Sequence, residues 1–176
     1  MLLCNLMNPT LNFHVKLLGF DFLSLTQQPS SLSSSSDPIS FYRKGKPISR
    51  VETVGVVVSR ELKSCKFLKF LIDDGTGCVP CIFWLNHLDS PYFFRRNPSD
   101  VQIMSKIANN QAAQIQLGVV ARVRGKITSY RGAPQITVAD VVVERDPNAE
   151  ILHWLQSIKL AQSCYNVNLP IAPLNR

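Results

Sequence analysis

The sequence predicts an all-β fold class with flanking helices, and three patterns support this prediction. Five stretches are rich in the aromatic and β-branched residues that favour strands. Two of these stretches flank residues 73–77, DDGTG, a turn sequence in which aspartate bonds its own backbone and glycine supplies positive φ angles. Apolar residues recur at helical spacing between the third and fourth strands and again after the fifth. We therefore expect five strands, one inserted helix and one C-terminal helix.

The first expected strand, Val51–Ser59, carries Gly55 in its middle, which suggests the bend or bulge that a closing barrel needs. The second and third strands, Phe67–Ile72 and Val79–Trp84, form a hairpin around the turn. Lys69 lies among apolar residues on one side of the second strand. We therefore expect that strand to be buried on one face only.

The inserted helix is expected to begin at Ser99–Gln102, which fits a capping box, and to end before Gly118. Val119–Tyr130 is the fourth strand, because its apolar and cationic residues alternate with a period of two. Residues 129–134 turn the chain, and Gln135–Val143 returns as the fifth strand.

The C-terminal helix is expected over Pro147–Ser163, because Asp146 is a favoured N-cap residue and proline is favoured at the first helical position. An apolar stripe follows at helical spacing, made of Ile151, Trp154, Leu155, Ile158 and Ala161. The barrel closes without this helix. The stripe must therefore fold back on its own barrel or pack against another chain.

The remaining residues are expected to lie outside the domain, which covers residues 41–165. Residues 1–25 are apolar but are interrupted by polar residues and lack the basic start of a signal peptide. Residues 26–38 are low in complexity and bury too little apolar surface to stay folded. We therefore expect residues 1–40 to be a disordered or poorly ordered tail and residues 166–176 to be a second tail.

The charge of the chain favours a polyanionic partner. The 176 residues carry a net charge of +7, and residues 41–145 hold 16 Lys and Arg residues against 8 Asp and Glu. Nucleic acid is the first expectation and an anionic membrane surface the second, while a solvated basic face without a partner is the alternative. No stretch is long and apolar enough to span a bilayer.

The five cysteines are odd in number and scattered, which suits a reducing compartment. Cys78 and Cys81 match a C-x-x-C pattern but lie three residues apart on an expected strand, so their side chains point to opposite faces. No second Cys or His pair follows at zinc spacing. We therefore expect no metal and no cofactor.

The strand and helix order matches the OB-fold, a five-stranded barrel with one helix between strands 3 and 4. Such barrels bind oligonucleotides or oligosaccharides on the second and third strands and on the loops joining strands 1–2 and 4–5. Here those elements are Lys63–Trp84 and Ser129–Pro134, where cations alternate with aromatic rings. Cations suit phosphates and flat rings suit unstacked bases. The candidate DNA-binding residues are Lys63, Lys66, Lys69, Asp73, Trp84, Arg124, Lys126, Tyr130 and Arg131.

Simpler interpretations exist for several of these residues. Trp84 shares strand parity with Ile82 and could belong to the core. Phe67 is expected to serve packing unless Lys69 lies on the ligand face. Tyr130 shares its strand face with three cations, which favours exposure. Asp73 and Asp74 could suggest a metal site, but two acids beside two glycines more often form only a turn.

A resemblance to a known family rests on motifs that stand in order along residues 41–165. They are Phe41 to Pro47 (FYRKGKP), Val51 to Gly55 (VETVG), Asp73 to Cys78 (DDGTGC), Val123 to Lys126 (VRGK) and Glu144 to Leu155 (ERDPNAEILHWL). In this run the chain resembles the Stn subunit of the CST telomere-capping complex, in its short, plant-type form with a single OB domain. The match omits residues 1–40 and has no counterpart of the winged-helix region that longer relatives carry.

The resemblance implies a partner for each surface of the domain. The family is similar to the second subunit of replication protein A, which implies single-stranded telomeric DNA binding within a nuclear trimer at chromosome ends. It also implies that the C-terminal helix, through Ile151, Trp154, Leu155 and Ile158, packs against a small OB-fold Ten subunit beside a large CST subunit. On this interpretation Trp154 is an interface anchor.

The residues bear on two other functions. An enzyme is not expected, because no nucleophile–base pair or phosphate loop appears and the three histidines are scattered. An OB-fold protein-interaction module without DNA binding of its own remains the alternative, since it would make the basic face incidental. Salt-dependent binding to single-stranded oligonucleotides separates the two.

Overall fold

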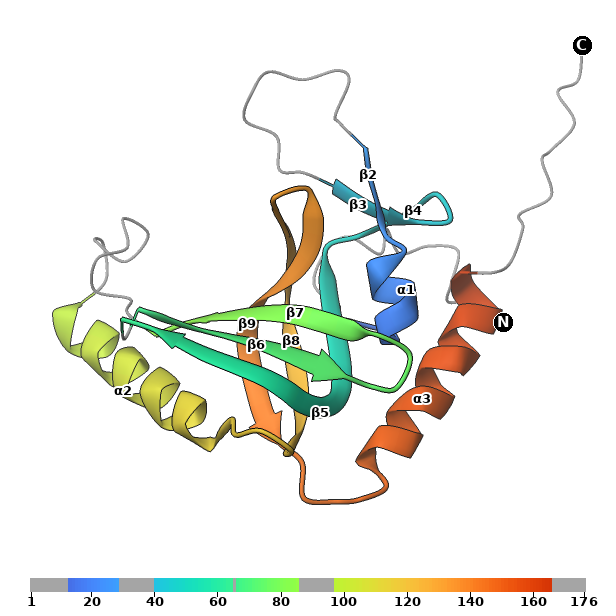
Figure 1. Ribbon diagram of the computed structural model, residues 1–176. Helices are drawn as coiled ribbons and strands as arrows, with labels where there is room; N and C mark the ends of the chain where they lie inside the picture. Colours follow the sequence, from blue (N-terminus) through green and yellow to red (C-terminus); the bar gives the residue numbers. More distant parts are fainter. Residues whose placement is uncertain (1–12, 29–39, 65, 86–96, 166–176) are drawn as a thin grey trace, which may run out of the picture.

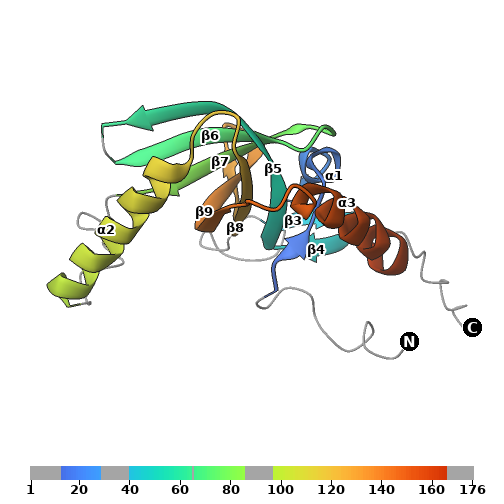
Figure 2. The same ribbon diagram turned by 90° about the horizontal axis from the view of Figure 1, so that it is seen from below.

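The computed structural model describes residues 13–28, 40–64, 66–85 and 97–165, and these residues form a mostly β protein with three α-helices (Figure 1). Figures 1 and 2 place helix α2 (Pro98–Gln114) at one end of the central sheet. Helices α1 (Gly19–Leu23) and α3 (Ala149–Leu160) lie at the other end. No helix in these described ranges is long and apolar enough to cross a membrane.

The central sheet has six strands: β1 (Val15–Lys16) lies at its edge, and the other five form a ring. Its order is β1-β5-β6-β7-β9-β8, and an additional pairing of β5 with β8 closes the ring. The ring strands are β5 (Arg50–Lys63), β6 (Phe67–Asp73), β7 (Cys78–Trp84), β8 (Val120–Tyr130) and β9 (Ala133–Val143). Each expected strand is present within a few residues of its predicted bounds, and the predicted hairpin is the antiparallel β6–β7 pair.

Strand β5 is long enough to pair with two neighbours, and this closes the ring. Its first half pairs with β8 and its second half with β6, with Val56 in both ladders. The register shifts between Val57 and Ser59, so the bulge lies a few residues beyond the predicted position. Gly55 has a different role: a Cβ there would lie 2.5 Å from the carbonyl oxygen of Asp73, so only glycine allows this close approach.

The core fills the inside of the ring with alternate residues of each strand. In β6 the buried residues are Leu68, Phe70 and Ile72, which leaves Phe67, Lys69 and Leu71 on the outer face. The alternation predicted for this strand is therefore confirmed. Burial of such side chains stabilises the fold by about 1.5–3 kcal/mol each.

Helix α2 (Pro98–Gln114) is the inserted helix and contributes buried alanines to one end of the core. Its N-cap is Asn97, whose side-chain oxygen accepts the backbone N–H of Ser99 at 3.2 Å, with Pro98 at the first helical position. The predicted capping box at Ser99 was therefore wrong, because proline fits the first turn and moves the cap two residues earlier. The helix ends before Gly118, as predicted.

The expectation of a poorly ordered N-terminal tail is wrong for residues 13–28. These residues form β1 (Val15–Lys16), α1 (Gly19–Leu23) and β2 (Thr26–Gln28). Val15 pairs in parallel with Val51 of β5, and the side chains of Leu17 and Phe22 are fully buried. The polar residues that interrupt the apolar pattern of this segment alternate with core residues, so they mark a solvent-facing side and not disorder. The rest of both expected tails, residues 1–12, 29–39 and 166–176, lies outside the described residues.

Strand β2 forms a small second sheet with β3 (Ser40–Arg43) and β4 (Lys46–Ile48). Phe41 and Ile48 of this sheet are buried in the same core as the ring. The domain therefore begins before residue 41, the boundary expected from the sequence.

The turn between β6 and β7 holds the N-terminal segment in place. The carboxylate of Asp74 is buried and accepts the backbone N–H of Gly19 at 2.7 Å, while the hydroxyl of Thr76 accepts that of Phe20 at 3.0 Å. Asp73 accepts the backbone N–H of Gly75 within the turn. The hydrogen bonds of the two aspartates thus serve the turn and its neighbour α1. Among the described residues no group of three or more His, Cys, Asp or Glu side chains comes together.

Helix α3 (Ala149–Leu160) follows the ring and continues into a short π-helical segment, Ala161–Tyr165. The carboxylate of Asp146 accepts the backbone N–H of Asn148, and Asn148 is the N-cap residue. The helix therefore begins later than predicted, because residues 146–148 form a turn in front of it.

Candidate nucleic-acid interface

The outer face of the β5–β6–β7 segment forms a groove floor beside the β8–β9 turn. Lys69 stands at its centre, paired across the sheet with Glu61 on one side and Ile82 on the other. Its ammonium lies 4.6 Å from the ring centre of Tyr130 and 5.6 Å from that of Phe67. Lys69 thus brings together two elements that are far apart in the sequence, β6 and the end of β8.

Two aromatic rings are exposed at this surface. Trp84 and Tyr130 have exposed fractions of 44% and 47%, so neither is a core residue. Phe67 pairs with Trp84 across the hairpin, with ring centres 5.1 Å apart and an edge-to-face angle of 68°. The alternative that placed Trp84 in the core is therefore excluded. Phe67 packs edge-to-face against the exposed indole of Trp84.

The position of Tyr130 follows from a tight turn. Tyr130 pairs with Ala133, so the β8–β9 connection has only Arg131 and Gly132, both with positive φ. Paired positive φ angles match the twist of a two-residue hairpin, and glycine accepts them freely. The guanidinium of Arg131 lies 5.3 Å from the ring centre of Tyr130. The turn thus holds a ring and a cation above the groove floor.

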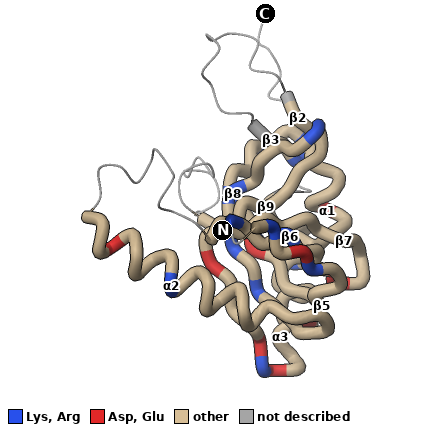
Figure 3. The backbone as a smooth tube through the Cα atoms, turned by 60° about the vertical axis from the view of Figure 1, so that its left-hand side comes forward, with Lys and Arg blue, Asp and Glu red and all other residues tan. Residues whose placement is uncertain are grey.

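The other predicted DNA-binding cations differ in how freely they face solvent. Lys63 forms an ion pair with Glu61 on the same face of β5, and Lys66 is exposed at the start of the hairpin. Lys126 is exposed on β8, where it pairs across the sheet with Arg50. Figure 3 colours the Lys and Arg positions of the described backbone blue.

Two predicted DNA-binding residues have structural partners elsewhere. Asp73 belongs to the β6–β7 turn through its bond to Gly75. Arg124 donates its Nε–H to Glu52 at 2.5 Å and lies 4.0 Å from the carboxylate of Asp140. The structure therefore does not bring these two residues together with Lys69 and Tyr130.

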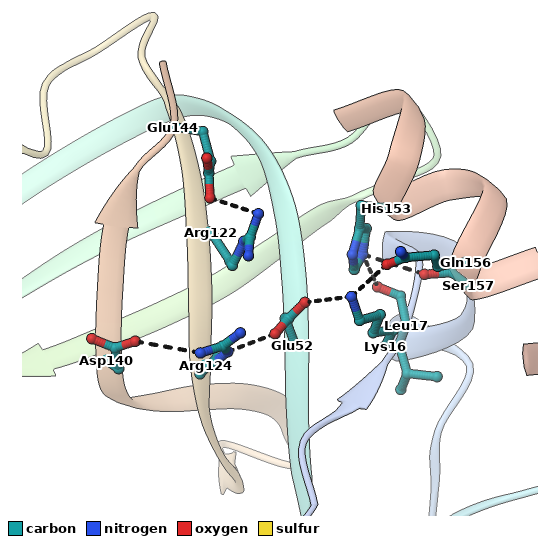
Figure 4. Close-up of polar contacts among 10 residues, drawn as sticks. All are labelled: Lys16, Leu17, Glu52, Arg122, Arg124, Asp140, Glu144, His153, Gln156 and Ser157. Atoms are coloured by element: carbon teal, nitrogen blue, oxygen red, sulfur yellow. Dashed lines mark hydrogen bonds and ion pairs between the residues drawn. The ribbon is translucent and has the colours of Figure 1, made fainter. Parts of the chain in front are cut away.

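Glu52 is the centre of a charged row that joins the ring to the N-terminal segment and lies next to α3 (Figure 4). Its carboxylate is almost fully buried and contacts both Arg124 and Lys16, the latter at 3.1 Å. Burial acts to raise the pKa of Glu52, but the hydrogen bonds from Arg124 and Lys16 outweigh it and leave that pKa lowered. Lys16 also donates to the amide oxygen of Gln156 on α3.

His153 makes a second contact between α3 and the N-terminal segment. Its Nε2 lies 3.3 Å from the carbonyl oxygen of Leu17 and 3.4 Å from the hydroxyl of Ser157. The side chain is buried, and burial lowers its pKa. The neutral imidazole is therefore the form that the folded protein holds.

We expect acid to weaken the fold in two stages because of these groups. Below the usual histidine pKa of 6.5 the unfolded chain binds a proton that folded His153 refuses, so stability falls as the pH drops from there toward the lowered pKa. Below the usual glutamate value of 4.5 the contribution of ionised Glu52 is lost in the same direction. Thermal melts between pH 8 and about pH 2 should show both stages, since the second lies below pH 4.5.

The variant His153→Gln should remove most of the first stage, because a glutamine amide can still donate to Leu17 but does not titrate. His14→Gln is the matched control. His14 is only partly buried, and burial also lowers its pKa, so its removal should flatten the curve less. An unchanged first stage in His153→Gln would assign the acid sensitivity to other groups.

The two cysteines of the C-x-x-C pattern are separated by the strand, as predicted. Cys78 is exposed and Cys81 is buried, and burial strongly raises the pKa of the Cys81 thiol. Their side chains therefore lie on opposite faces of β7.

The closed ring, the helix inserted between its third and fourth strands and the groove crossed by the β8–β9 turn define an OB-fold protein. Solved structures agree on the fold. Stn1 in the S. pombe Stn1–Ten1 complex matches with a TM-score of 0.63 and 20% identity, over 86% of this chain and 93% of that chain. A replication protein A heterotrimer bound to single-stranded DNA contains a chain that matches with a TM-score of 0.61 and 18% identity, over 86% of this chain and 97% of that chain.

Sequence relatives define the family. The chain is 53% identical over 156 residues to the CST complex subunit STN1 of Arabidopsis thaliana, covering 89% of this chain and 94% of the relative. The chain belongs to the STN1 family of CST complex subunits. STN1 of Ailuropoda melanoleuca is 26% identical over 168 residues, and this chain spans 44% of its length. No protein-family profile matches the chain. Because these relatives are named as subunits of a complex, the expectation that the chain is not an enzyme is confirmed.

Proposed function

We propose that this chain is the single-stranded DNA-binding subunit of a CST-type complex that protects chromosome ends in the nucleus and assists their replication. The observation that carries the proposal is the exposure of Trp84 and Tyr130 beside Lys69 and Arg131. Stacking on aromatic rings together with cations along a groove is how OB-folds hold single strands. The similarity to STN1 and to a chain of a DNA-bound replication protein A supports this function.

The groove suits a single strand better than a duplex. Its rings stand on two different elements, Trp84 at the end of β7 and Tyr130 at the β8–β9 turn, with Lys69 between β7 and that turn. Bases can stack on such rings only when they are unpaired and splayed from one another. The ammonium and guanidinium groups beside the rings are then available to the phosphates.

Salt dependence tests DNA binding directly. If Lys66, Lys69, Lys126 and Arg131 each neutralise one phosphate, log Kobs should fall with log[salt] with a slope of roughly −3, since single strands contribute about −0.7 per contact. Fluorescence anisotropy of a labelled oligonucleotide between 50 and 300 mM salt measures the slope. Lys106→Gln, on the exposed side of α2, is the control that should leave the slope unchanged. Undetectable binding at low salt would favour the protein-interaction module.

We also propose that α3 binds a small OB-fold subunit of the Ten1 type within a complex that includes a large CST subunit. The buried residues of α3 are small or polar: Ala149, His153 and Ser157. The other side of the helix leaves large apolar residues in solvent, with exposed fractions of 61% for Ile151 and 62% for Leu155. The helix therefore both folds back on its own ring and offers an apolar face to a partner, and the solved Stn1–Ten1 complex supports a partner of this kind.

The sequence predicts Trp154 as an anchor of the partner interface, but its contacts are with its own ring. Its indole N–H donates to the carbonyl oxygen of Asp74 at 3.1 Å, and its ring lies against Gly75 in the β6–β7 turn. Trp154 thus ties α3 to its own ring. The residues that we propose to contact the partner are therefore Ile151, Leu155 and Ile158, together with the exposed Leu152.

Replacing Ile151 and Leu155 together with alanine should weaken partner binding by about 2 kcal/mol or more, because buried anchors of this type dominate interfaces. The thermal melt of the variant alone should not move, since both side chains are exposed without the partner. Co-purification with the small subunit and a melt measure the two effects. Trp154→Ala is the matched control and should lower the melting temperature. Retained partner binding in the double variant would remove this face from the interface.

A further inference from the structure

A small pocket opens on the groove floor beside Tyr130. It has a volume of about 170 Å³, and its walls include Leu71 and Pro80 from the hairpin and Gln135 from β9. An engineered cavity of about 150 Å³ in another protein holds benzene, so a pocket of this size admits a flat ring. Its position under an exposed tyrosine is where an unstacked base would enter.

The polar lining of the pocket combines opposite charges. Glu61 and Lys69 are direct cross-strand neighbours, and both line the pocket. A carboxylate only accepts hydrogen bonds, and an ammonium only donates them. Glu61 also forms an ion pair with Lys63, and more than half of its side chain is exposed.

An acid at this place opposes binding of the phosphate backbone. The cations Lys66, Lys69 and Arg131 lie on the same groove elements, and a carboxylate among them repels phosphates. An exposed ion pair with Lys63 contributes little to stability. Neither phosphate binding nor stability therefore accounts for the Glu61 carboxylate. Its position in the pocket points to a role in binding a base.

Building on the proposed DNA binding, we propose that the pocket takes one unstacked nucleobase and that Glu61 makes guanine the preferred base. The edge of guanine carries two neighbouring donors, N1–H and the N2 amino group, which match the two oxygens of one carboxylate. The O6 and N7 atoms of guanine accept hydrogen bonds and suit the ammonium of Lys69. Tyr130 and Pro80 supply flat and apolar surfaces for the ring.

The other bases fit Glu61 less well. Thymine presents a single N–H between two carbonyl oxygens, which would face the carboxylate. Adenine and cytosine present an amino group beside an unprotonated ring nitrogen, whose lone pair would meet the second carboxylate oxygen. Two matched hydrogen bonds discriminate between bases by about five- to 150-fold.

The experiment uses the full chain and labelled oligonucleotides of equal length and charge. One is all thymidine, and the others carry a single guanosine, adenosine or cytidine at successive positions. Anisotropy titrations give a binding ratio for each base relative to thymidine. We expect one position at which guanosine binds about five- to 150-fold more tightly. Glu61→Gln should bring that ratio close to one, because the amide offers one acceptor and one donor.

Glu150→Gln on α3 is the matched control, since it changes the net charge equally and lies outside the pocket. It should leave the guanosine ratio at its original value. Equal tightening of all oligonucleotides by Glu61→Gln, with the ratio unchanged, would mean that the carboxylate only repels phosphates and would overturn the proposal. An absence of any base preference in the unmodified chain would overturn it while leaving DNA binding intact. Failure to bind any oligonucleotide would instead overturn the DNA-binding function, and the base pocket with it.

Discussion

A variant with alanine at both Trp84 and Tyr130 is expected to bind single-stranded oligonucleotides about 2–6 kcal/mol more weakly than the unmodified chain. Each stacked base contributes about 1–3 kcal/mol when measured by alanine substitution. Both rings are exposed, so their removal leaves the core intact. The loss corresponds to roughly 30-fold to more than 10,000-fold in affinity, which anisotropy titrations at fixed salt can measure.

Conservative and distant variants separate stacking from other effects. Trp84→Phe with Tyr130→Phe keeps two flat rings and should retain most of the affinity. Phe20→Ala removes an aromatic ring that is 68% exposed on α1, away from the groove, and should leave DNA binding unchanged. Full affinity in a folded Trp84→Ala/Tyr130→Ala variant that still binds its partner would exclude both rings from the site.

Much of this groove could be predicted from the sequence, because it depends on local patterns. The alternation in β6 puts Lys69 on the outer face, and the turn residues after Tyr130 define a hairpin. The strand order then brings the β6–β7 hairpin and the β8–β9 turn to the same side of the ring. A period-two pattern and a short turn need no knowledge of distant contacts.

Two of the assignments that changed depend on partners far away in the sequence. The sequence predicts Arg124 among the DNA-binding cations, but its partner Glu52 lies 72 positions earlier. Trp154 belongs to the apolar stripe by helical spacing, yet its indole donates to Asp74, 80 positions earlier. Periodicity identifies which residues share a face of an element. It does not identify what that face meets.

The order of the N-terminal segment also depends on distant contacts that periodicity does not reveal. Its strand β1 has only two residues and its helix α1 only five, too short for a periodic pattern to stand out. The segment is ordered by its contacts with β5 and with the buried carboxylate of Asp74. A signal was present in the alternation of Val15 and Leu17 with polar residues. The low complexity of the following residues obscured it.

Deletion of residues 1–25 is therefore expected to prevent the chain from folding. The deletion removes four buried core side chains, those of Val15, Leu17, Phe22 and Leu25. At about 1.5–3 kcal/mol each, their burial amounts to about 6–12 kcal/mol. The stability of a whole domain is only about 5–15 kcal/mol, so a loss of this size leaves no margin. The deletion also takes away the backbone donor of Gly19 and leaves the buried Asp74 carboxylate with fewer partners. A thermal melt followed by circular dichroism should show no cooperative transition.

Two neighbouring phenylalanines of α1 test the same idea without a deletion. Phe22 is fully buried and Phe20 is 68% exposed, although both belong to one short helix. Phe22→Ala should cost about 3–5 kcal/mol of unfolding free energy, because it empties a core position. Phe20→Ala should change it by less than about 0.5 kcal/mol, as surface substitutions generally do. Residues 1–12 keep the prediction of a poorly ordered tail, so their deletion alone should leave the melt in place. A cooperative melt near the original temperature after deletion of residues 1–25 would mean that the ring folds without β1 and α1. The domain would then begin near residue 41, as the sequence pattern first suggested.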